Sequence, residues 1–211
     1  MDTKQALIKN ALALGNTYKE YREVVSNHVR SNTTSGPNQA DALINYTKLN
    51  DARMKRLDKT TKISEGHQTI FSNYQKKVTW LVLTESWCGD AAQSLPVLNK
   101  IALIMPHLTL KVVLRDQHKQ LMEHFLTNDA MAIPKLIATD EVSGVIIGQW
   151  GPRPSEATKM VAAYKAANGS LSPEFKKDLQ VWYTKDKGQS IIEEITPVSY
   201  THLTLPTMVQ V

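Results

Sequence analysis

The stretch that decides the fold is VTWLVLTESWCGDA, residues 78–91. Its first seven residues are apolar or β-branched almost without interruption, which is typical of a strand buried on both faces of a sheet. The run ends near Cys88, the only cysteine in the 211-residue chain. Because a helical pattern follows directly, we expect Cys88 to lie between the end of a strand and the start of a helix.

Strands and helices alternate on the C-terminal side of this stretch. Apolar runs predict three further strands at 108–114, 134–139 and 144–150, the last two as a hairpin. Helical spacing of apolar residues occurs at 90–105, 117–126, 154–168 and 172–187. We therefore expect an α/β fold with one mixed four-stranded sheet flanked by helices. The first two strands should be parallel, and the last two should run antiparallel to them.

Residues 1–75 show only helical patterns. Apolar residues recur every three or four positions over 3–30, 43–57 and 65–74, and a Gly-Pro loop lies at 31–41. These patterns predict a helical N-terminal extension, residues 1–75, before a domain of residues 76–195. The extension carries no motif with recognisable chemistry.

Residues 198–211 are set apart by composition. The segment VSYTHLTLPT, 198–207, is rich in threonine and has almost no charge. It resembles the translation of a transposon-end adapter used in preparing sequencing libraries. We therefore interpret 198–211 as a non-native tail outside the fold. A genuine C-terminal strand is the alternative, because β-branched and aromatic residues favour strands.

Composition excludes several classes of protein. The formal net charge is only +5, and the lysines are scattered among acidic residues, which does not favour a nucleic-acid surface. A single cysteine excludes an internal disulfide. The first residues lack a signal-peptide pattern, and no apolar run is long enough to span a membrane. The histidines are dispersed, so we expect no metal site, and we expect a cytoplasmic protein without nucleic-acid or membrane partners.

Two motifs and their spacing point to a family. WCGDA, 87–91, lies between a strand and a helix that contains Pro96, and WGPRP, 150–154, follows the last strand. An Ile133–Pro134 pair opens the third strand, 46 residues after Cys88. Over about residues 40–195 the chain resembles the thioredoxin family, most closely its bacterial members with a helical N-terminal extension and these two motifs.

The resemblance implies roles for several residues. Cys88 matches the nucleophilic first cysteine of the thioredoxin motif, and Trp87 matches the tryptophan before it. Pro134 matches the cis-proline that faces the sulfur, which makes Ile133 its neighbour at the site. Pro96 matches the proline that bends the active-site helix.

Three departures from the family pattern limit what this cysteine can do. Ala91 stands where the second cysteine is expected, and Asp90 replaces the proline after Gly89. Val82 occupies the position of a buried carboxylate that handles protons in thioredoxins. The ordinary dithiol mechanism therefore lacks every part except the nucleophile.

The reactivity of Cys88 depends on opposing effects. A helix N-terminus stabilises a thiolate, whereas Ala91 has no S–H to donate and Asp90 adds negative charge. Arg115 and Arg153 are candidate counter-charges, because both should reach this edge of the sheet. The sequence leaves open which effect prevails.

Two functions follow from these residues. The first is thiol–disulfide exchange or redox sensing by a monothiol oxidoreductase, with a protein thiol or disulfide as partner and an external thiol such as glutathione as resolving agent. The second is a non-catalytic module that holds a protein along the proline groove. A buried structural cysteine is the plainest alternative. We predict Cys88 as the catalytic residue, no cofactor or metal, and these binding residues: Trp87, Gly89, Asp90, Arg115, Ile133, Pro134 and Arg153.

Overall fold

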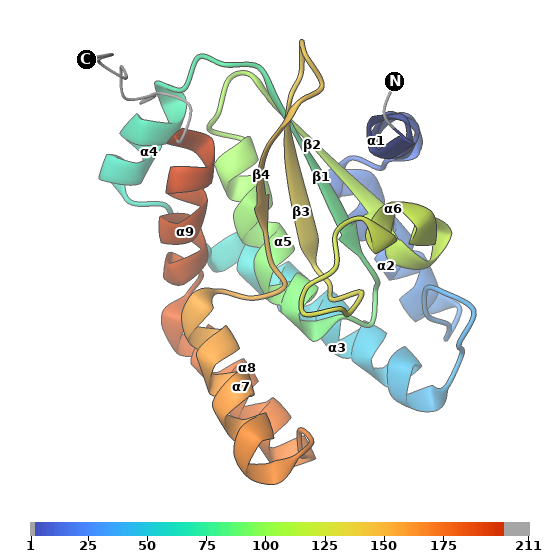
Figure 1. Ribbon diagram of the computed structural model, residues 1–211. Coiled ribbons are helices and arrows are strands. Elements are labelled where there is room, and N and C mark those ends of the chain that lie inside the picture. Colours follow the sequence, from blue (N-terminus) through green and yellow to red (C-terminus); the bar gives the residue numbers. More distant parts are fainter. Residues whose placement is uncertain (1–2, 201–211) are drawn as a thin grey trace.

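The chain folds around one four-stranded sheet, shown in the computed structural model of Figure 1. The structure describes residues 3–200, and their side chains to residue 196. The strands are β1 (Val78–Thr84), β2 (Leu108–Leu114), β3 (Lys135–Asp140) and β4 (Ile146–Trp150), in the order β2-β1-β3-β4. Every residue of β1 is buried, as its continuous apolar sequence predicts.

The strand directions correct one expectation. β1 and β2 are parallel, β3 is antiparallel to β1, and β4 is antiparallel to β3. β4 therefore runs parallel to β1, and the prediction that both later strands oppose the first two is wrong for β4. A hairpin reverses the chain, so its two strands cannot both run antiparallel to the same neighbour.

Helices cover both faces of the sheet (Figure 1). On one face lie α5 and α9, with α3 packed on α5, and on the other face lie α1 and α6. None of the helices within residues 3–200 has the length and apolar character needed to cross a membrane. The helices are α1 (Thr3–Leu14), α2 (Tyr18–Arg30), α3 (Asp41–Thr60), α4 (Glu65–Ser72), α5 (Gly89–Ala102), α6 (Lys119–Glu123), α7 (Ser155–Asn168), α8 (Pro173–Asp186) and α9 (Gln189–Tyr200).

The predicted helical stretch 3–30 is interrupted. Asn16 pairs with Val112 of β2 through two backbone hydrogen bonds of 2.9 and 2.8 Å. Thr17 then begins α2 with a capping box that Glu20 completes. The break lets the chain hydrogen-bond to the edge strand β2 before it turns into α2, and helical periodicity alone does not reveal such a pairing.

At the C-terminal end, α9 continues to Tyr200. Its first half places Ile191, Ile192 and Ile195 in the main core. The helix therefore includes residues 198–200 of the segment interpreted as a tail. The rest of that segment, 201–211, lies outside the described residues.

The core is divided into two clusters. The main cluster contains side chains of the extension, such as Tyr21 and Phe71, together with β1 side chains such as Trp80. The hairpin of α7 and α8 has a separate small cluster of its own. The extension is thus packed into the main core, whereas the α7–α8 hairpin has its own cluster and is linked to α5 by the Tyr183–Asp90 and Gln93–Gln180 hydrogen bonds.

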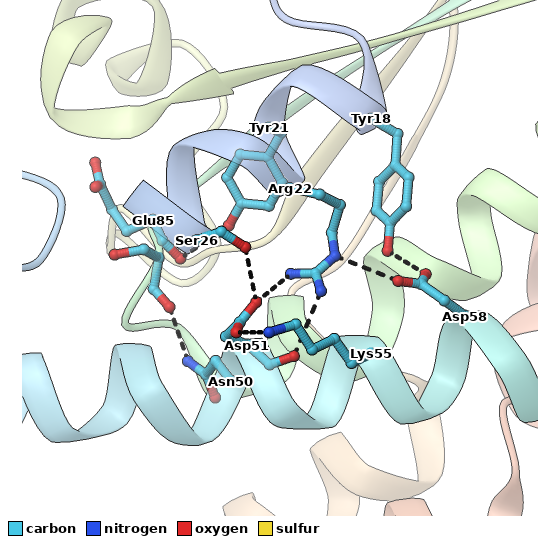
Figure 2. A network of polar contacts seen from close by, with 10 residues as sticks. Tyr18, Tyr21, Arg22, Ser26, Asn50, Asp51, Lys55, Asp58 and Glu85 are labelled. Atoms are coloured by element: carbon cyan, nitrogen blue, oxygen red, sulfur yellow. Dashed lines mark hydrogen bonds and ion pairs between the residues drawn. The ribbon is translucent and has the colours of Figure 1, made fainter. Parts of the chain in front are cut away.

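A partly buried polar network connects α2 with α3 (Figure 2). Arg22 lies 3.0 Å from a carboxylate oxygen of Asp51 and 3.3 Å from one of Asp58, and the Tyr18 hydroxyl donates to Asp58 at 2.6 Å. The residue before Asp51 in α3, Asn50, donates from its side-chain amide to the backbone oxygen of Ser86 at 2.9 Å. The extension therefore holds the chain two residues before Cys88.

Candidate functional site

A cleft of about 620 Å³ lies where the segments after β1, β2 and β4 meet the segment before β3. The cleft contains seven of the eight predicted site residues: Trp87, Cys88, Gly89, Asp90, Arg115, Ile133 and Arg153. Pro134 is buried directly beside them but does not line the cleft. Residues predicted from separate motifs are thus brought together at one edge of the sheet.

Cys88 occupies the N-cap position of α5. The side chain is 7% exposed, and its S–H group donates to the backbone oxygen of Ile133 at 3.3 Å. The peptide bond between Ile133 and Pro134 is cis. The thiol therefore lies against the segment before β3, with only a small part of its surface open to the cleft.

Burial decides the protonation of this thiol. Burial, and to a smaller extent the neighbouring charge of Asp90, raise the pKa of Cys88 to about 12. The backbone N–H groups of Ala91 and Asp90, together with Arg153, act in the opposite direction but do not prevail. Of the effects that the sequence left open, desolvation and Asp90 therefore dominate, and the thiol is protonated at neutral pH.

Asp90, in the first turn of α5, contacts one residue of the segment after β4 and one residue of α8. Its carboxylate lies 2.7 Å from Nη2 of Arg153 and accepts a hydrogen bond of 3.0 Å from the Tyr183 hydroxyl on α8. Burial raises the pKa of Asp90, while the Arg153 ion pair and the Tyr183 hydrogen bond lower it. Arg153 of the WGPRP segment is therefore positioned as the counter-charge of Asp90. The hydrogen bond from Tyr183 also links the α7–α8 hairpin to the start of α5.

Arg115 has a different place in the cleft. It forms an ion pair of 2.8 Å with Asp116, and its guanidinium lies 5.2 Å from the ring centroid of Trp87. It also donates to the backbone oxygen of Met131 at 3.3 Å. Arg115 and Asp116 thus form a strand-end ion pair beside the site, and Arg115 supports Trp87 rather than neutralising Asp90.

The glycine of WGPRP explains how Arg153 reaches the site. Gly151 has φ +111°, and a Cβ built on it would lie 2.1 Å from the backbone oxygen of Pro134. Only glycine allows this close approach between the segment after β4 and the segment before β3. Trp150, in contrast, packs in the core and donates to Glu194 on α9 at 2.8 Å, so it does not line the cleft.

A buried carboxylate was missed in the sequence. Glu85 is fully buried three residues before Cys88 and accepts hydrogen bonds from the Ser35 hydroxyl and, at 2.8 Å, from the Asp116 backbone N–H. Burial raises its pKa. Its bonds join the loop after α2 to the segment after β2. The position of Glu85 directly after an apolar strand was the available signal.

The sequence also missed the outer walls of the cleft. One wall comes from α3 of the extension and the other from α8: Leu43, Tyr46, Arg53, Lys176, Lys177 and Gln180. The extension thus contributes side chains to the cleft, Arg53 among them, although it carries no recognisable motif. Within residues 3–200, no group of three or more His, Cys, Asp or Glu side chains is arranged to hold a metal ion.

The sheet order and the cysteine between β1 and α5 define a thioredoxin-fold protein. The family model described as Thioredoxin matches residues 36–165, more than half of the chain, so the chain belongs to the thioredoxin family.

Two solved structures share the fold. A protein of unknown function from Pseudomonas aeruginosa has a TM-score of 0.58 and 15% identity, over 73% of this chain and 86% of the other. An HIV epitope-scaffold has a TM-score of 0.55 and 15% identity, over 71% and 84%. No curated protein sequence matches the chain significantly.

Proposed function

We propose that this protein is a thioredoxin-fold binding module in which Cys88 performs no redox chemistry. The observation that carries the proposal is the burial of the thiol and its hydrogen bond to the backbone oxygen of Ile133, and the raised pKa favours the protonated form. At neutral pH, a pKa of about 12 leaves roughly three-thousandfold less thiolate than a free cysteine has. Because the thiolate is the nucleophile, exchange at Cys88 would be correspondingly slow.

The cleft supports the binding role. Its volume of about 620 Å³ lies within the range of small-molecule sites, which is about 300–1,000 Å³. Apolar side chains such as Trp87, Met131 and Leu179 line it together with charged groups. Three parts of the chain form it, namely α3, the segments at the sheet edge and α8. The proposal includes a cytoplasmic location, where a single cysteine stays reduced.

A monothiol oxidoreductase is the second candidate. It is favoured by the backbone N–H groups of Asp90 and Ala91, which lower the pKa of Cys88 from the start of α5. In that mechanism the Cys88 thiolate attacks a partner disulfide, forms a mixed disulfide and expels the other sulfur as a thiolate. The thiolate of an external thiol such as glutathione then attacks the partner sulfur of the mixed disulfide, forms a new disulfide with the partner and expels Cys88 as a thiolate.

Reduction of insulin disulfides with dithiothreitol separates the two candidates. The binding module predicts no turnover above the dithiothreitol background for the parent, and none for Ala91→Cys, because one added S–H donor does not offset the burial that keeps Cys88 protonated. The monothiol oxidoreductase predicts that Ala91→Cys raises turnover. Circular dichroism should show that the variant folds, since Ala91 is buried. A clear rise in the folded variant would contradict the binding module.

A further inference from the structure

The lining of the cleft is strongly cationic. Its charged side chains come from α3, the strand ends and α8: Arg53, Arg115, Arg153, Lys176, Lys177 and the single carboxylate Asp90. The chain as a whole carries 25 basic and 20 acidic residues. The ratio of basic to acidic residues is therefore much higher in the cleft lining than in the whole chain.

Internal ion pairs neutralise only part of this charge. Arg153 is paired with Asp90, and Arg115 is paired with Asp116. Arg53, Lys176 and Lys177 form no ion pair within the described part of the chain. Asp90 lies close enough to Arg53 for their charges to interact, but it is already paired with Arg153. The cleft lining therefore carries Arg53, Lys176 and Lys177 with no ion pair of their own and one shared carboxylate.

The guanidinium of Arg53 is fixed in position beside the start of α5. It is partly buried, and its Nη1 atom donates to Asn50 Oδ1 at 2.8 Å. The same atom lies 3.6 Å from the position that a Cβ on Gly89 would occupy, so it stands beside the first residue of α5. Desolvation lowers the pKa of Arg53, and the nearby charge of Asp90 offsets this only in part. A bound anion would compensate the rest.

We propose that the cleft binds a small organic anion with at least two negative charges and an apolar portion. The two charges match the unpaired cations of α3 and α8, and the apolar portion matches the side chains of Trp87, Met131 and Leu179. The cleft volume suits a small molecule. This inference rests on the proposed function, because it names the class of ligand that the binding module holds.

Isothermal titration calorimetry with naphthyl phosphate as the probe tests the charge and apolar requirements together. We expect naphthyl phosphate to bind about tenfold or more tightly than naphthol, which lacks the charge, and than inorganic phosphate, which lacks the rings. Binding should weaken as salt is added, because the α8 lysines are exposed and their charges are screened.

A pair of matched variants tests the position of the charges. Lys176→Gln with Lys177→Gln removes two cations from the cleft, and we expect affinity to fall about tenfold. Lys165→Gln with Lys185→Gln removes the same charge from exposed positions of α7 and α8 outside the cleft and should change affinity less than about twofold.

The outcomes are decisive in each direction. Absence of measurable binding, equal binding of naphthol, or equal loss in both lysine pairs would overturn the anion site. Alkylation of Cys88 is measured separately on the same samples. If the anion fails to bind while the thiol stays unreactive, only the ligand class is wrong. If the anion binds while the thiol reacts like a free cysteine, the assignment of a redox-inactive module is wrong.

Discussion

Asp90→Asn is the perturbation that tests most of the site at once. The substitution keeps the shape of the side chain and an oxygen that can accept the Tyr183 hydrogen bond, but it removes the negative charge. Arg153 is then left without its partner at 2.7 Å, and Cys88 loses the charge that helps to raise its pKa. The variant should therefore change both the stability of the fold and the reactivity of the thiol.

The stability loss follows from the burial of the pair. Removing one partner of a fully buried ion pair costs about 3–5 kcal/mol. The Arg153 side chain is 23% exposed and keeps some hydration, so we expect about 2 kcal/mol here. In a chain of this size that corresponds to a melting temperature lower by about 4–8 °C.

The same substitution should make the Cys88 thiol easier to ionise. Loss of a nearby negative charge, with Arg153 left uncompensated, should lower the pKa of Cys88 by about one to two units. The pKa then still exceeds that of a free cysteine, about 8.5, because burial remains.

Alkylation by iodoacetamide, followed by mass spectrometry at several pH values, measures this change together with thermal melting. Tyr183→Phe is the control, because it removes the hydrogen bond to Asp90 without changing a charge. The control should lose stability but leave the pH dependence of alkylation nearly unchanged. An Asp90→Asn variant with the alkylation profile of the parent would refute the electrostatic role of Asp90. A profile like that of free cysteine would refute the dominance of burial.

Three further predictions concern stability. Gly151→Ala should unfold the protein or destabilise it by more than about 3 kcal/mol in urea, because its Cβ would meet the Pro134 oxygen. Gly66→Ala, at an exposed position of α4 with open space around it, should stabilise the protein by about half a kcal/mol. Arg22→Met should cost about 3 kcal/mol, because it leaves the buried Asp51 with only the exposed Lys55 as an ionic partner. Lys55→Met, whose side chain is 61% exposed, should cost under about 1 kcal/mol in the same assay. Because the folded pKa of Cys88 is raised, the unfolded chain ionises first, so the parent should lose about 1.4 kcal/mol per pH unit above about pH 8.5 relative to Cys88→Ala.

Local sequence patterns predicted the sheet well. The strands β1 and β2 have the predicted bounds, because their apolar runs are continuous and their ends are marked by polar residues. The break between α1 and α2 escaped prediction because it depends on Asn16 pairing with a strand almost a hundred residues later in the chain. Periodicity reports which face of a segment is apolar and carries no information on such a partner.

The same limit applies to the site. Arg115 and Arg153 were both predicted to reach this edge of the sheet, and both line the cleft. Only Arg153 contacts Asp90, because Arg115 is paired with Asp116, the next residue in the chain. Arg53 and Tyr183 come from helices that share no motif with WCGDA, so their meeting at the start of α5 follows only from tertiary packing.

The central claim is that Cys88 is a protonated, non-nucleophilic thiol. Because the chain has one cysteine, labelling cysteine with carbon-13 at Cβ gives a single NMR signal whose position reports ionisation of this thiol. The structure predicts that the signal does not titrate below about pH 10 while the protein stays folded. A midpoint at or below that of a free thiol, about pH 8.5, would contradict the binding module and favour the monothiol oxidoreductase.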